Sequence, residues 1–265
     1  MALQRGAVTM QADRLSGSLH GIAVQGMTAK VEMKMAGSDH LVTVQPAPVA
    51  IASVQTGVEM TNLAAMMELD WRWTDPWPTV DLRELQGTVF GGTLTSPGMR
   101  IDPGKPPHRM TVSLRQIDLA QVLQVEGQKR LAGSGLINGT IPIAVSPSGV
   151  SVKEGTLEAQ SPGGTIRYAP GPDAGKLIAE SDQSLRLVAQ ALTNFHYDVL
   201  RAGVQYGEEG ILNLSVRLEG RNPDVKKSPP IHFNLTVQEN IPALLKSLRL
   251  VQDIEDTLEQ RVSGR

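Results

Sequence analysis

The residue types that most often do chemistry in proteins form no recognisable catalytic pattern in this chain. The chain has no cysteine, which excludes a disulfide framework, a thiolate nucleophile and a cysteine-ligated metal. No two of its five histidines are four residues apart, and none lies in an H-E-x-x-H motif. There is no G-x-S-x-G nucleophile motif, and the acidic residues are scattered. The sequence therefore predicts no catalytic residue, no metal site and no cofactor, and it favours a protein that binds or scaffolds over an enzyme.

A glycine-rich segment, Gly133 to Asn138, comes nearest to a nucleotide-binding motif. In a dinucleotide-binding protein the G-x-G-x-x-G loop opens a helix, whose dipole helps to hold the pyrophosphate. Here the glycines precede an alternating segment that is typical of a strand, so we interpret the segment as a turn. The net charge of -2 likewise gives no electrostatic footprint for nucleic acid.

Alternation of apolar and polar residues dominates the chain, and this period of two is typical of half-buried strands. Between residues 136 and 146, for example, Ile141, Ile143 and Val145 alternate with polar or small residues. Short runs of the same kind recur from residue 7 to residue 49. Gly155 interrupts a later run and is expected to mark a β-bulge. The sequence therefore predicts a mainly β protein.

Few segments have helical spacing. Asp118 is a plausible N-cap for a short helix, and residues 62–67 fit either a strand or a helix. An amphipathic helix is predicted from Ser181 or Asp182, with an apolar stripe that continues through Phe195 and Val199. Two strong strands should follow, over residues 212–218 and 231–237. A final amphipathic helix should then begin near residue 240.

The expected organisation is one continuous domain. Residues 1–180 should form a β-groove of short meandering strands, and residues 181–265 its C-terminal end, with a helix, two strands and the final helix. The chain begins within strand pattern and has no signal peptide, so we expect a fragment of a longer protein. No window of eighteen residues is apolar throughout.

All three tryptophans fall close together, at Trp71, Trp73 and Trp77, and prolines 76 and 78 end the run. One interpretation is local packing over the sheet. The other is an aromatic rim at a lipid or membrane interface, where tryptophan is enriched.

The apolar face of the predicted strands needs a cover. A second sheet, packed helices or a hydrophobic ligand can provide one. The first 170 residues contain too little helix to do so, which leaves a closed sandwich or a trough lined with aliphatic groups. Periodicity does not choose between them.

Several segments together resemble the C-terminal part of the YdbH family of AsmA-like envelope proteins, to which TamB and YhdP are related. They are residues 118–123, the GxxxGxIPI segment 135–143, the strand 149–159, the PGGxIxY turn 162–168 and the segment 230–250. The resemblance covers roughly residues 80 to 262.

The resemblance implies a long, curled, taco-like β-sheet groove in the periplasm of a Gram-negative bacterium. Such a groove would bridge the inner and outer membranes and conduct phospholipid. The family's N-terminal anchor in the inner membrane is missing from this chain. The resemblance also implies a partner, a small outer-membrane lipoprotein of the YnbE type, which adds strands to the C-terminal end by β-augmentation.

Two sets of residues are the candidates for these roles. The expected groove lining is Ile137, Ile141, Ile143, Val145, Val150, Val152, Leu157, Leu212, Leu214, Val216 and Leu218. The expected docking strand for the partner carries Ile231, Phe233, Leu235 and Val237, unless it is an internal strand covered by the last helix. The alternative for the whole chain is a structural β-sandwich module of the envelope with no lipid conduit.

Overall fold

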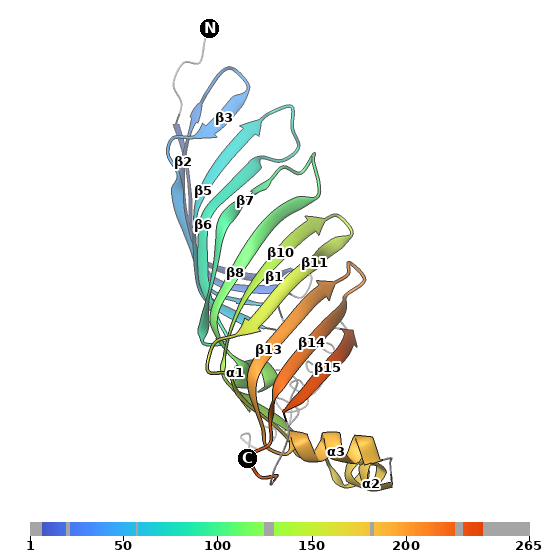
Figure 1. Cartoon of the computed structure of the whole chain (residues 1–265). Helices are drawn as coiled ribbons and strands as arrows, with labels where there is room; N and C mark the ends of the chain where they lie inside the picture. Colours follow the sequence, from blue (N-terminus) through green and yellow to red (C-terminus); the bar gives the residue numbers. More distant parts are fainter. Residues whose placement is uncertain are drawn as a thin grey trace, which may run out of the picture.

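A computed structural model describes residues 7–19, 22–56, 58–124, 130–180, 183–225 and 230–240. In these residues 15 strands form a single sheet, in which the paired strands run antiparallel (Figure 1). The strands bend along their length, so the sheet is curled. The prediction of a mainly β fold with a curled groove is confirmed, and the described strands do not divide into two stacked sheets.

The elements follow one another along the chain with short connections. They are β1 (Ala7–Leu19), β2 (Ile22–Met35), β3 (His40–Thr43), β4 (Ala47–Gln55), β5 (Glu59–Arg72), β6 (Thr79–Val89), β7 (Gly92–Ile101), β8 (His108–Asp118), α1 (Leu119–Gln124), β9 (Leu131–Ser134), β10 (Leu136–Ser146), β11 (Gly149–Ala159), β12 (Gly164–Tyr168), α2 (Pro172–Glu180), α3 (Gln183–Leu192), β13 (Phe195–Tyr206), β14 (Ile211–Arg221) and β15 (Ile231–Asn240).

Strand order in the sheet largely follows chain order. β3 and β4 share the space between β2 and β5. β12 pairs with the start of β13, beside the part of β13 that pairs with β11, and β12 in turn pairs with β9. The sheet is continuous across residue 180, because β11 and β14 both pair with β13. Among the described strands, β1 pairs only with β2 and β15 pairs only with β14, so both lie at edges.

Bulges in successive strands explain much of the curl. Asn62 in β5, Glu84 in β6 and Gln116 in β8 have φ values of 52°, 54° and 56°, and each lies at a shift in strand register. A bulge adds a residue to one strand, bends it and increases its twist. The predicted bulge at Gly155 is confirmed, because the register between β11 and β13 shifts between Val152 and Gly155.

Replacing Gln116 by valine should destabilise the protein by about 1–2 kcal/mol, because a β-branched residue is strained at positive φ. Replacement by glycine, which adopts this conformation readily, is the matched control and should cost less. Urea unfolding of the two variants measures the difference. Equal unfolding midpoints would contradict a bulge at this position.

The helices differ from expectation in extent. The predicted N-cap is confirmed, because Asp118 Oδ1 accepts a hydrogen bond of 2.9 Å from the Ala120 N–H at the start of α1. Residues 62–67 belong to strand β5. The prediction that Phe195 and Val199 continue the amphipathic helix is wrong: α3 ends at Leu192, and both residues lie in β13. Helix α2 was not predicted, and the predicted final helix lies outside the described residues.

Asn222 explains where α3 ends. Its side chain is fully buried and donates hydrogen bonds to the carbonyl oxygens of Gln190 (2.9 Å) and Ala191 (3.3 Å). The last carbonyls of a helix have no partner within the helix, so this amide satisfies them from a distant part of the chain.

Substitution of Asn222 by alanine should therefore cost about 1–3 kcal/mol of unfolding free energy, since the buried Ala191 carbonyl and the partly buried Gln190 carbonyl would lose their donor. Alanine at Ser215, an exposed residue of the same chain region, should change the unfolding free energy by less than about 0.5 kcal/mol. Chemical denaturation of both variants tests the difference, and similar losses would show that Asn222 does not have this role.

Two buried apolar clusters lie on the sheet. The larger is centred on Phe195 and Phe233, whose rings meet edge to face with centroids 5.2 Å apart, and it includes Tyr197 and residues of α1 and α3. The smaller cluster consists of Val31, Met33 and Ala47, with half-buried residues of β3 and β5 packed against it.

Tyr197 makes the larger cluster sensitive to high pH. Its hydroxyl donates a hydrogen bond of 2.8 Å to the Ser134 carbonyl oxygen, and burial raises the pKa of Tyr197 from 10.0 to about 12. The unfolded chain can ionise this tyrosine near pH 10, whereas the folded chain keeps it protonated. The contribution to stability is therefore complete below pH 10 and is lost as the pH rises towards 12.

We expect that loss to be about 2–3 kcal/mol between pH 10 and pH 12. Urea unfolding over this range should show it in the wild type, and the Tyr197→Phe variant should show a shallower decline. Parallel declines in the two proteins would contradict the assignment to Tyr197.

Candidate functional site

The register of the sheet brings the predicted groove residues onto one face. Directly opposed residues of an antiparallel pair point to the same side of a sheet. Ile143 of β10 lies opposite Val152 of β11, which lies opposite Tyr206 of β13, which in turn lies opposite Leu212 of β14. Stepping by two along each strand, and allowing for the bulge at Gly155, places all eleven predicted lining residues on this side, which we name the apolar face.

The predicted docking strand shares the same face. In β15, Phe233, Leu235 and Val237 lie opposite Leu218, Val216 and Leu214 of β14. In the other direction, Ile141 and Ile143 lie opposite Val112 and Met110 of β8.

Further apolar pairs continue the face towards the N-terminus. Leu114 of β8 lies opposite Leu94 of β7, and Leu82 of β6 lies opposite Met67 of β5. Met67 and Leu69 then pack against Val31 and Met33 of β2. The apolar face therefore runs from β2 to β15.

Burial on the apolar face is deep for a structure with a single described sheet. Val112 is only 3% exposed and Val152 is 8% exposed, whereas Arg201, Gly203 and Gln205 on the other face are exposed. A flat sheet without a second layer leaves both faces open to solvent. We therefore identify the apolar face as the inner side of the curl.

Exposure divides the predicted residues into two groups. Ile137, Leu218 and Phe233 are buried in the larger cluster. The other members are less enclosed, apart from Val152: Val150, Leu235 and Val237 are exposed, and the rest are half-buried, namely Ile141, Ile143, Val145, Leu157, Leu212, Leu214, Val216 and Ile231. These less enclosed side chains are the ones that a ligand can reach.

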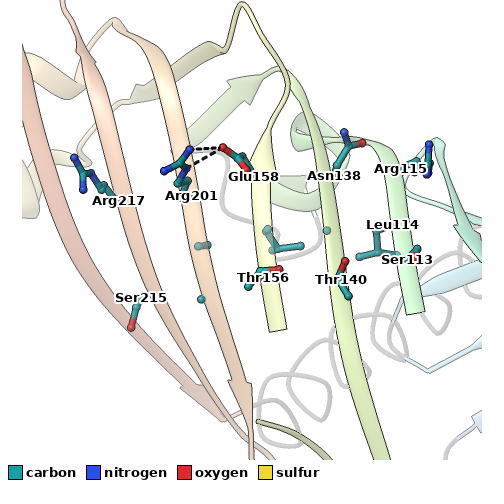
Figure 2. Close-up of a pocket in the computed structure, with 14 residues that line it drawn as sticks. Ser113, Leu114, Arg115, Asn138, Thr140, Thr156, Glu158, Arg201, Ser215 and Arg217 are labelled. Atoms are coloured by element: carbon teal, nitrogen blue, oxygen red, sulfur yellow. Dashed lines mark hydrogen bonds and ion pairs between the residues drawn. The ribbon is translucent and has the colours of Figure 1, made fainter. Parts of the chain in front are cut away.

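The opposite face is polar. Figure 2 shows Arg115, Asn138, Glu158, Arg201 and Arg217 on neighbouring strands, where they line an open hollow. Arg201 binds Glu158 through Nε and Nη2, both at 2.8 Å. Arg217 Nε lies 2.6 Å from the carboxylate of Glu219, and this hydrogen bond lowers the pKa of Glu219. The two faces of the sheet therefore suit different surroundings, one apolar and one aqueous.

The glycine-rich segment lies at the junction of β9 and β10. Gly135 has a φ of 123°, and a Cβ there would collide with the Tyr197 hydroxyl, so the junction needs glycine. A strand follows it, as predicted, but the interpretation of the segment as a turn is wrong, because residues 133 and 134 belong to β9 and residues 136–138 to β10. In the described part of the chain, no three histidine, aspartate or glutamate residues are grouped so as to hold a metal ion. The described helices are all too short or too polar to cross a membrane.

The sequence pattern did not predict the surroundings of all three tryptophans. Trp73 and Trp77 are 59% and 68% exposed at the hairpin between β5 and β6, so packing over the sheet describes neither of them. Trp71 is half-buried, lies opposite Leu41 and donates through Nε1 to the Asp75 carbonyl oxygen at 3.0 Å. Spacing alone could not show that the run crosses the tip of a hairpin.

A long curled sheet with one continuous apolar face is a surface for extended apolar ligands, which it can hold without directional bonds. The sequence profile of the YdbH-like family, described as "Intermembrane phospholipid transport protein YdbH", matches residues 1–263, and the chain belongs to this family. The resemblance predicted from the sequence is thus confirmed.

A curated relative is the "Probable phospholipid transport protein YdbH" of Escherichia coli (strain K12). The two are 23% identical over 224 residues, which make up 84% of this chain and 25% of the relative. The chain therefore spans about a quarter of the relative's length. No solved structure matches the chain.

Proposed function

We propose that this chain is a segment of a periplasm-spanning bridge and that phospholipids move along its apolar face between the inner and outer membranes of a Gram-negative bacterium. The observation that carries this proposal is the unbroken apolar face from β2 to β15. The family's description as an intermembrane phospholipid transport protein supports it. At about 4.8 Å per strand, the face is on the order of 50 Å long.

The physical basis is nondirectional burial of acyl chains. Removing apolar surface from water is worth roughly 25 cal/mol per Å². An aliphatic surface such as Ile141, Ile143 and Val216 makes no directional bond to a hydrocarbon, so one position along it is energetically close to the next. A bound lipid can therefore slide, while its headgroup stays in water at the open side.

We also propose a docking site for a small outer-membrane lipoprotein along β15. Among the described strands β15 pairs only with β14, so one of its edges is open to β-augmentation. Leu235 and Val237 are exposed next to that edge, and an added strand would extend the apolar face.

Lipid content tests the proposed conduit. The chain is purified from the periplasm without detergent, and bound lipid is identified by native mass spectrometry and by extraction. We expect phospholipid in stoichiometric or greater amount. A folded but lipid-free protein that also fails to take up phospholipid from mixed micelles would contradict the proposal and favour a structural module whose only contact is the β15 edge.

A further inference from the structure

The hairpin between β5 and β6 holds every tryptophan of the chain. Trp73 and Trp77 are the most exposed aromatic side chains near the smaller cluster, and polar residues 74 and 75 lie between them. Two exposed indoles on one hairpin form a candidate contact surface for a ligand that suits an amphipathic ring.

An apolar path leads from the groove to this hairpin. Met67 and Leu69 pack against the smaller cluster, and Trp71, two residues further along β5, is half-buried. Trp73 is the next residue in the same phase and is exposed. Met67, Leu69 and Trp71 are thus all half-buried, and the exposed side chains begin at Trp73, beyond the end of β5.

Two hydrogen bonds hold the tip in place. Trp71 Nε1 donates to the Asp75 carbonyl oxygen at 3.0 Å, across the turn. The Trp73 N–H donates to the Asp39 carbonyl oxygen at 2.9 Å, which fastens the hairpin to the connection between β2 and β3. The exposed indoles are therefore presented from an anchored position.

The change from half-buried side chains in β5 to exposed indoles at the tip matches the change from acyl chain to headgroup in a phospholipid. Indole is favoured where hydrocarbon gives way to water, because its ring is apolar and its N–H is a hydrogen-bond donor. Acyl chains on Met67, Leu69 and Trp71 would place the glycerol and headgroup region close to Trp73 and Trp77.

We propose that Trp73 and Trp77 form a lip site, which binds the interfacial region of a phospholipid whose acyl chains lie on the apolar face. This inference rests on the proposed function. The bound molecule is a lipid carried in the groove and not the surface of a bilayer, because the apolar path is continuous from the buried cluster to the tip. Trp73 and Trp77 would then fix the position of the lipid at one rim of the groove.

Intrinsic fluorescence tests the lip site, because tryptophan emission comes only from this hairpin. The chain is loaded with phosphatidylcholine brominated either near the glycerol or near the chain end and is then separated from vesicles. The variant Trp71→Phe reports Trp73 and Trp77, and the double variant Trp73→Phe/Trp77→Phe reports Trp71. We expect strong quenching of the tip pair by bromine near the glycerol and weaker quenching by bromine near the chain end.

The outcomes separate the two proposals when bound phosphorus is measured in the same samples. Bound lipid without quenching of the tip pair would overturn the lip site alone. Quenching that appears only after brominated vesicles are added would also overturn it, in favour of docking on a bilayer. Failure to bind lipid at all would overturn the proposed function and the lip site together.

A second measurement does not require that the Trp71→Phe variant folds. In the wild type, loading with unbrominated lipid should shift the tryptophan emission to shorter wavelength, because Trp73 and Trp77 leave water. The variant Trp73→Ser/Trp77→Ser should release lipid about tenfold faster, which corresponds to about 1.4 kcal/mol, whereas Thr74→Ser should not. An unchanged emission and release rate would contradict the lip site.

Discussion

Replacing Leu214 by glutamate should abolish lipid carriage, while glutamate at the adjacent Ser215 should leave it unchanged. Leu214 is half-buried on the apolar face between Val204 and Val237. Ser215 is exposed on the polar face of the same strand. The two variants add the same charge one residue apart and differ only in the side of the sheet that receives it.

The size of the effect follows from desolvation. A carboxylate placed against an acyl chain, with no partner for its charge, costs several kcal/mol, and every 1.4 kcal/mol is a factor of ten in binding. The affinity for phospholipid around residue 214 should therefore fall by at least about a hundredfold in Leu214→Glu, and the bound lipid should fall by the share that this part of the face holds. Extraction and quantification of co-purified lipid gives the measurement, with circular dichroism to show that both variants fold. Equal lipid content in the two variants would contradict the binding of phospholipid to the apolar face.

Proline in β15 should separate docking from folding. Successive residues of a strand direct their N–H groups to opposite edges, so Asn234 and Leu235 differ in whether the N–H faces β14 or the open edge. Proline at the residue that faces β14 removes a bond of the sheet. Proline at the other residue removes only a donor that the partner strand would use.

We therefore expect one of the variants Asn234→Pro and Leu235→Pro to keep the wild-type unfolding midpoint and lose binding to the lipoprotein by about a hundredfold or more. Pull-down with a YnbE-type lipoprotein, together with thermal unfolding, measures both properties. Full binding by the variant that keeps its stability would show that β15 is not the docking edge, whatever happens to the other variant.

Most of the strands and the apolar face could be predicted from the sequence, because the alternation of apolar and polar residues is visible in it. A bulge shifts the alternation of side chains by one residue. When this shift is counted, Ile143 and Leu157 fall on the same face of the sheet. The bulge at Gly155 could be predicted, because a glycine inside a strand often marks a bulge. Glu84 and Gln116 gave no such signal, because neither residue type favours positive φ, and Asn62 gave only the weak signal that asparagine adopts positive φ more often than most residues.

Nonlocal contacts account for what the sequence could not predict. Phe195 continues the helical spacing of α3, but Asn222, far along the chain, satisfies the last carbonyls of that helix. Burial of Ile137 and Leu218 depends on their packing with residues of α1, α3 and β13. Exposure of Trp73 depends on the hairpin and on its bond to Asp39. Each of these features depends on contacts with residues that are distant in the sequence, and the local pattern does not identify those residues.

Site-specific photocrosslinking at Ile143 and Ala144 tests the central claim most directly. These neighbours in β10 lie on opposite faces, and both are half-buried. A photoreactive residue at Ile143 should capture phospholipid in living cells, detected as a mass shift or by phosphorus labelling, whereas the same residue at Ala144 should capture none. Capture at neither position, or equal capture at both, would contradict a lipid path along the apolar face.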